Sequence, residues 1–268
     1  MEILKVIILG IIEGITEWLP ISSTGHMILA DEFIHLDVSR DFMNMFLVVI
    51  QFGAILAVIS LYFRKLCPWT LDGKFKVQHE VVIMWIKIIA ATLPAAVVGY
   101  FLDDFITERL YNPVVIGAML IIYGIAFLVV ENKRKKPTVM KLENLTMKTA
   151  VTIGLFQMLA LVPGTSRSGA IIVGALAIGV SRVVATEFAF FLAIPVMFGA
   201  SLLKVHKFQG TFTPNESNIL IIGTAVSFAV SVLCIRFLMK YIKTNDFKPF
   251  GYYRVTLGIL VIVYFALK

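Results

Sequence analysis

Side chains that can move a proton or hold a cation lie close together near the start of the chain. Two carboxylates, three hydroxyls and an imidazole occur within fourteen residues: Glu13, Glu17, Ser22, Ser23, Thr24 and His26. Glu13 and Glu17 are four positions apart, so on a helix they share one face. Such a pair can bind a divalent cation or serve as acid and base. The alternative is a structural pair that Arg167 or water neutralises.

A hydroxyl-rich turn follows the two carboxylates. It consists of Ser22, Ser23, Thr24 and Gly25, and a short apolar segment comes after it. Free N–H groups at a helix start, flanked by hydroxyls, suit an anion, whereas the simpler interpretation is an ordinary N-cap. His26 lies three residues after Ser23. A lone histidine is usually structural, but this one is within reach of activating Ser23 as a nucleophile.

A second hydroxyl-rich turn occurs in the other half of the chain. It comprises Pro163, Gly164, Thr165, Ser166, Arg167, Ser168 and Gly169, and it also begins a short apolar segment. The Arg167 guanidinium at its centre suits bidentate binding of a phosphate. The alternative is that Arg167 only neutralises a glutamate, and the two roles are compatible.

The composition is that of a protein that crosses a membrane several times. Of 268 residues, 59% are hydrophobic and 15% are charged, and the mean hydropathy is +0.91, which is unlike a soluble domain. We expect six spans, near residues 42–63, 81–101, 112–130, 184–203, 218–239 and 251–267. The net charge of +7 resides in short loops, which indicates membrane orientation and argues against nucleic-acid binding.

Each polar turn interrupts an apolar region. The regions 3–35 and 148–180 break at the turns, and the segment 170–180 has only 11 residues. A helix of that length spans about 16 Å of a hydrocarbon core that is about 30 Å thick. Each region therefore predicts a re-entrant hairpin whose polar loop is buried in protein or lines a wet cavity. The alternative is two poor spans in each region.

The two halves of the chain repeat at an offset of 144 residues. The matches are Gly10 with Gly154, Glu13 with Gln157, Ser22 with Ser166, Thr24 with Ser168, and Gly25 with Gly169. A hairpin plus three spans per half is an odd number of crossings, which inverts the second half. We predict an all-α integral membrane protein of one domain, 1–268. It would contain two inverted repeats, 1–135 and 145–268, with six transmembrane helices and two re-entrant helical hairpins.

The charges of the loops orient this topology. The loops 64–80, 131–149 and 240–250 carry thirteen Lys and Arg residues, and the loops on the other face carry four. The positive-inside rule makes the first set cytoplasmic. We therefore expect the first hairpin to enter from the outside and the second from the cytoplasm.

Four motifs together resemble one family. The stretches 13-EGITE-17, 20-PISSTGH-26, 163-PGTSRSG-169 and 187-EFAFFLAIP-195 are similar to the motifs of the undecaprenyl-diphosphate phosphatases of bacteria, also called the bacitracin-resistance protein family. The resemblance covers essentially the whole chain. One position departs from the family's arginine motif, because Ile171 stands where a threonine is usual.

The resemblance implies a plasma-membrane phosphatase whose active site opens to the extracytoplasmic side. It would hydrolyse a polyprenyl diphosphate held among membrane lipids, undecaprenyl diphosphate, to the monophosphate and inorganic phosphate, which recycles the lipid carrier for cell-wall synthesis and confers bacitracin resistance. Its cofactor would be a divalent cation, Mg²⁺ or Ca²⁺, and Glu13 and Glu17 would bind this cation or orient His26. We expect Ser23 to attack the terminal phosphorus, with His26 as its base or as the proton donor to the leaving group. Water and His26 remain alternative nucleophiles, and a homodimer is left open.

The phosphate group has its own set of expected contacts. The catalytic set comprises Glu13, Glu17, Ser23, His26 and Arg167, and the phosphate-binding set comprises Ser22, Thr24, Gly25, Thr165, Ser166, Ser168 and Gly169.

The main rival function is a secondary transporter or lipid flippase, because inverted repeats with broken helices are common in transporters. The other membrane phosphatase superfamily and a purely structural membrane protein are weaker rivals.

Overall fold

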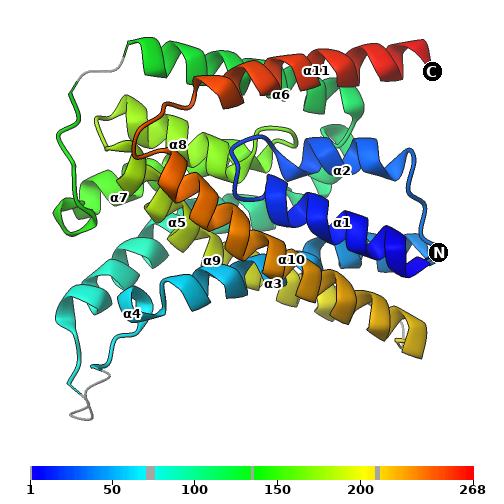
Figure 1. Cartoon of the computed structure of the whole chain (residues 1–268), viewed down its shortest axis with the longest axis horizontal. Helices are drawn as coiled ribbons and strands as arrows, with labels where there is room; N and C mark the ends of the chain where they lie inside the picture. Colours follow the sequence, from blue (N-terminus) through cyan, green and yellow to red (C-terminus); the bar gives the residue numbers. More distant parts are fainter. Residues whose placement is uncertain (1, 71–75, 134–135, 209–211) are drawn as a thin grey trace.

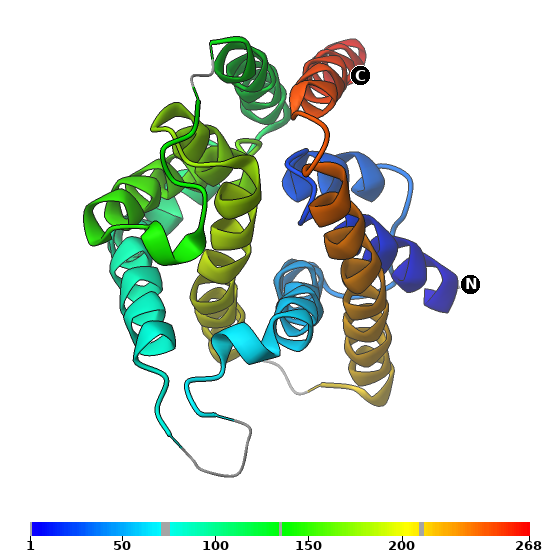
Figure 2. The same cartoon turned by 60° about the vertical axis from the view of Figure 1, so that its left-hand side comes forward.

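The computed structural model describes residues 2–70, 76–133, 136–208 and 212–268, and for residues 103, 104 and 107 only the backbone. These residues form helices joined by short loops, and within them no strand is longer than an isolated bridge. Figures 1 and 2 show the arrangement from two directions. The predicted all-α class is confirmed.

Among the described residues, six helices are long and apolar enough to cross a membrane. They are α3 (Arg40–Leu61), α5 (His79–Arg109, apolar up to residue 102), α6 (Pro113–Asn132), α9 (Arg182–Lys207), α10 (Pro214–Tyr241) and α11 (Lys248–Leu267). All six predicted spans are confirmed as helices of this kind. Their starts follow from local sequence: the side chain of Ser39 caps α3 and that of Asn112 caps α6, and such caps satisfy N–H groups that have no partner within the helix.

The remaining helices are shorter. They are α1 (Glu2–Thr16), α2 (Ser23–Asp31), α4 (Phe63–Leu66), α7 (Met147–Met158), α8 (Arg167–Ala177) and the 3₁₀ turns η1 (Leu142–Asn144) and η2 (Leu159–Leu161). The chain leaves helical structure at both predicted polar turns, between α1 and α2 and between η2 and α8. The two broken regions are therefore pairs of short helices, as the sequence indicates, and their re-entry into a membrane stays a prediction.

Helices of the first half of the chain pack against helices of the second half. α1 lies against α10 and α7 against α5, whereas α6 lies along α11 (Figure 1). Glycines permit the closest approaches, since a Cβ on Gly154 would lie 2.0 Å from the carbonyl oxygen of Ala91, and one on Gly53 would lie 2.2 Å from that of Thr224. Small residues let helix backbones approach in this way in membrane proteins. Two repeats would produce such pairings, and their boundaries and inversion stay predictions.

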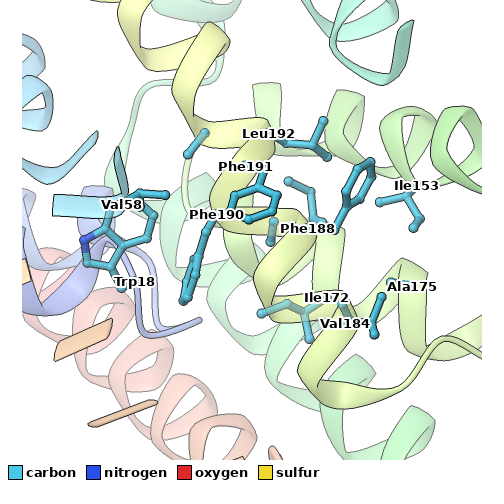
Figure 3. Close-up of a cluster of buried hydrophobic side chains, with 14 of the residues drawn as sticks. Trp18, Val58, Ile153, Ile172, Ala175, Val184, Phe188, Phe190, Phe191 and Leu192 are labelled. Carbon is cyan, nitrogen blue, oxygen red and sulfur yellow. The ribbon is translucent and has the colours of Figure 1, made fainter. Parts of the chain in front are cut away.

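The main core surrounds α8 and α9. Every residue of α8 from Ser168 to Leu176 is buried, as expected for a helix enclosed by protein on all sides. Figure 3 shows the aromatic part of this core, where Trp18 meets Phe190 edge to face with ring centroids 5.1 Å apart. Trp18 belongs to the first polar turn, so the core fixes that turn against α9.

Candidate functional site

The two polar turns meet at the carboxylate of Glu17. Its Oε1 accepts a hydrogen bond from Nη2 of Arg167 at 2.8 Å, and its Oε2 accepts one from the Ser23 hydroxyl at 3.0 Å. Glu17 is buried and Arg167 has a side-chain exposure of 13%. The structure thus brings an acid, a hydroxyl and a guanidinium from opposite halves of the chain into one contact. Arg167 neutralises a glutamate, and its position at the start of α8 also suits a phosphate.

Further contacts hold the second turn in place. Nη1 of Arg167 donates to the carbonyl oxygen of Ala189 on α9 at 3.2 Å. The Ser168 hydroxyl donates to the backbone carbonyl of Glu17 at 3.3 Å and lies 3.2 Å from the hydroxyl of Ser166. Because these side chains are already held in place, they need little reorganisation when charge develops beside them.

Ser22 and Ser166 have the same unusual backbone and the same role. Their φ angles are 74° and 70°, and among the described residues no other non-glycine residue has a positive φ. The Ser22 hydroxyl accepts from the N–H of Gly25 at 3.3 Å, and that of Ser166 accepts from the N–H of Gly169 at 3.1 Å. Both serines are therefore N-caps. Backbone strain of about 1–3 kcal/mol per residue is typical of functional sites.

His26 has partners other than Ser23. Its Nδ1 lies 2.7 Å from the carbonyl oxygen of Ser22, and its Nε2 lies 2.7 Å from the hydroxyl of Tyr253, whose ring stacks on the imidazole. Because a carbonyl only accepts, Nδ1 carries the hydrogen, and in a neutral ring Nε2 accepts from Tyr253. The hydroxyl of Ser23 donates to Glu17 instead, so Glu17 occupies the position expected for the base.

Arg254 is a site residue that the motif analysis missed. It lies on α11 and is fully buried, and it donates to the carbonyl oxygens of Pro20 at 3.2 Å, Gly164 at 3.0 Å and Thr165 at 2.8 Å. One guanidinium therefore ties the backbone of the first turn to that of the second. The signal was available in the sequence, because an ionisable side chain inside an apolar span is costly and is by default a functional candidate.

Several buried polar atoms around the two turns lack a hydrogen-bond partner among the described residues. They are Oε1 of Glu13, both side-chain heteroatoms of Gln157, Oγ1 of Thr165, Nε of Arg254 and Nε1 of Trp18. Buried polar groups are rarely left unpaired in native proteins, so each of these atoms indicates a place for water, an ion or a ligand. Thr24 lies half-buried in the first turn of α2, beside Ser23.

Buried carboxylates elsewhere in the described chain do have protein partners. Glu131 accepts from Nε and Nη2 of Arg182 and from the N–H of Phe247, and Glu187 pairs with Lys65. Glu13 differs from these carboxylates, although its charge interacts with those of Glu17 and Arg167. It is therefore the carboxylate with capacity for a further ligand.

A divalent cation fits this donor set only together with other ligands. Among the described residues, no three His, Cys, Asp or Glu side chains gather closely enough to hold a metal ion. Mg²⁺ is usually held by one or two carboxylates plus water and substrate phosphates. Glu13 near the end of α1 and Glu17 just after it, four residues apart, match that pattern.

The chain is similar over its full length to proteins of one family. The family model described as bacitracin resistance protein BacA matches residues 6–260. An undecaprenyl-diphosphatase of Acetivibrio thermocellus is 55% identical over 267 residues, covering 99% of this chain and 98% of the relative. One of Desulfitobacterium hafniense is 58% identical over 271 residues, and undecaprenyl-diphosphatase 1 of Clostridium acetobutylicum is 58% identical over 270 residues, each covering 100% of this chain and 98% of the relative.

Proposed function

The chain belongs to the bacitracin resistance protein BacA family and has undecaprenyl-diphosphatase activity, and we propose that it acts at the outer face of the bacterial plasma membrane. There it hydrolyses undecaprenyl diphosphate to undecaprenyl phosphate and inorganic phosphate, which recycles the lipid carrier for cell-wall synthesis. The observation that carries the assignment of the active site is the contact of Glu17 with both Ser23 and Arg167.

The phosphate-binding part of the mechanism uses groups that are already oriented. Arg167 and the free N–H groups at the starts of α2 and α8 lie where the two turns meet. Phosphoryl transfer depends mainly on positioning and on neutralising the phosphoryl oxygens. When the diphosphate enters, Arg167 exchanges part of its contact with Glu17 for phosphoryl oxygens, and the carboxylate becomes free to accept a proton.

The bond-making step falls to Ser23. Its Oγ attacks the terminal phosphorus, the bond to the bridging oxygen breaks, and undecaprenyl phosphate leaves. The hydroxyl proton passes to Oε2 of Glu17, which already accepts it as a hydrogen bond at 3.0 Å. Water then cleaves the phosphoserine, and inorganic phosphate is released. His26, held by Tyr253, is placed one helical turn from Ser23 to exchange a proton with the leaving group.

Glu13, together with Glu17, would hold the divalent cation that the family resemblance implies. The unpartnered Oε1 of Glu13 supports this assignment. Such a cation supplies neutralisation of diphosphate charge. Within the pair, Glu13 offers the unpartnered oxygen, whereas both oxygens of Glu17 are also engaged by Arg167 and Ser23.

The proposed orientation follows from the charges and the hydrophobic surface of the helices. The basic loops lie at the ends of the spans that we assign to the cytoplasm, and the two turns contact each other through the Ser168 hydroxyl and the backbone carbonyl of Glu17. Exposed apolar side chains on α5, α10 and α11 would face lipid tails, including the polyprenyl chain of the substrate.

Phosphate release from a polyprenyl diphosphate by the purified chain tests the site. We expect Ser23→Ala and Arg167→Ala each to lower turnover at least a hundredfold, whereas Ser60→Ala is the matched control because its hydroxyl bonds only within its own helix. Near-normal turnover of Ser23→Ala would refute the serine nucleophile, and near-normal turnover of Arg167→Ala would refute the phosphate contact. Detection of a phosphoserine at residue 23 after rapid quenching would support the covalent step directly.

A further inference from the structure

A pocket lined by basic side chains lies at the end of the seam between α3 and α10. It has a volume of about 330 Å³, and its lining includes Leu61, Tyr62, Ile235 and Met239 together with Arg236, Lys240 and Lys243. All of its charged lining residues are thus cations. The pocket is separate from the active site, because its lining includes none of Glu17, Ser23 and Arg167.

The three cations lie close together along the chain at the end of α10. Arg236 and Lys240 are spaced i, i+4 and share one face of α10, and Lys243 follows in the turn just after the helix. All three side chains are exposed, and none has an ion-pair or hydrogen-bond partner among the described residues. Three uncompensated cations at the end of a transmembrane helix attract an anion that lies at the membrane surface.

The seam below the cations is apolar. A second pocket, of about 480 Å³, lies further along the same two helices and is lined by Leu56, Leu220, Ile221, Thr224, Ala225 and Phe228. From Arg236 to Ile221 the helix rises about 22 Å. A cationic pocket and an apolar pocket on the same two helices at this spacing match the polarity of a lipid, with the charged head at one end and an acyl chain along the helix.

We propose that the α3–α10 seam binds an anionic phospholipid, with its phosphodiester on Arg236, Lys240 and Lys243 and an acyl chain in the groove lined by Leu56, Ile221 and Phe228. The basic loops assign this end of α10 to the cytoplasmic leaflet, which in bacteria and other cells carries anionic lipids on which juxtamembrane basic residues act. The site is on the face opposite to the proposed entry of the substrate, so the bound phospholipid is a structural partner and not the substrate.

Charge and shape together favour a lipid over a soluble anion. A free phosphate would satisfy the cations but would make no apolar contact with Leu61, Ile235 and Met239, which line the same pocket. An acyl chain also covers side chains such as Leu233 and Phe237, which are more than half exposed on the same helix. The proposal does not rest on the phosphatase activity, so the two can fail separately.

Native mass spectrometry of the full-length protein in detergent, titrated with phosphatidylglycerol, phosphatidylethanolamine or inorganic phosphate, tests the site. We expect the wild type to retain phosphatidylglycerol in preference to the other two. The triple variant R236Q/K240Q/K243Q should bind it on the order of a hundredfold more weakly, about fivefold for each cation removed, while its phosphatase activity stays at the wild-type level. The variant K133Q/K141Q/K148Q removes the same charge from another basic loop and should bind as the wild type does.

A second variant separates the head-group contacts from the groove. Ala225→Trp fills the apolar pocket at an exposed position without any change of charge, and it should also weaken binding of phosphatidylglycerol at least tenfold. Equal binding by wild type and the triple variant would overturn the proposal, as would equal losses in the two triple variants. Inorganic phosphate that displaces the phospholipid at similar concentration would show a soluble-anion site and would equally overturn it.

Discussion

Arg254 offers the sharpest test of how the active site is held together. Its guanidinium makes three hydrogen bonds of 3.2 Å or less, one to the first turn and two to the second. A hydrogen bond to a charged group is worth about 1.5–3 kcal/mol, so Arg254→Met removes about 4.5–9 kcal/mol of gross interaction. Relief of the desolvation cost of a buried charge offsets several kcal/mol of this loss.

The effect on activity should exceed the effect on stability. Without the guanidinium the carbonyl groups of Pro20, Gly164 and Thr165 have no common partner, and the two turns can separate. A misplacement of about 1 Å lowers turnover about a hundredfold, so we expect kcat to fall by that factor. Arg254→Lys keeps the charge but loses the fork that reaches both turns, and it should retain about a tenth of the wild-type kcat.

The assay is phosphate release from a polyprenyl diphosphate, combined with thermal unfolding of the purified protein in detergent. Arg236→Met is the matched control, because that arginine is exposed on α10 and lines the separate basic pocket. If folded Arg254→Met turned over within threefold of the wild type, the role of Arg254 in joining the turns would be refuted. A loss of the same size in Arg236→Met would show that the assay reports general destabilisation.

Three further predictions follow from single contacts. Gly164→Ala should lower kcat at least tenfold, because Gly164 has φ +88° and a Cβ there would lie 2.5 Å from the carbonyl oxygen of Ile116. The control Gly199→Ala should match the wild type, since a Cβ at residue 199 would have no atom within 4 Å. Tyr253→Phe should lower kcat about tenfold through loss of the hydrogen bond to His26, and an unchanged rate would count against a catalytic His26. Glu131→Leu should lower the free energy of unfolding by about 2–3 kcal/mol. This is less than the loss of a partner in a fully buried ion pair, because the Arg182 side chain is 28% exposed. The kcat of the folded fraction should stay unchanged.

Local chemistry explains why so much of the fold was predictable. Hydropathy and length identify the six long helices, since each must satisfy its own backbone hydrogen bonds across an apolar layer. The turns at residues 17–22 and 162–166 also follow from local sequence, because proline, glycine and hydroxyl side chains end helices and cap the next ones. In the structure, Ser22 and Ser166 both have a positive φ. The sequence repeat also pairs these two serines, so the two halves share backbone conformation as well as residue type at this position.

Partners of the site residues were less predictable. Spacing along the helix placed His26 near Ser23. In the structure, however, His26 forms a hydrogen bond with Tyr253, and Ser23 donates one to Glu17. Tyr253 is 227 residues away from His26 in the chain, so no local pattern could reveal that contact. Which side chains meet depends on how distant helices pack, and small differences in rotation of a helix change every partner on its face.

The sequence by itself determined the number of apolar helices, the two places where they break, and the residue types that could handle a phosphate. The tertiary structure alone decided that Glu17 links Ser23 to Arg167, that Glu13 keeps an oxygen without a partner, and that Arg254 joins the two turns. The reason is physical: helix formation and burial depend on nearby residues, whereas hydrogen bonds across the site depend on packing between segments about 150 to 230 residues apart.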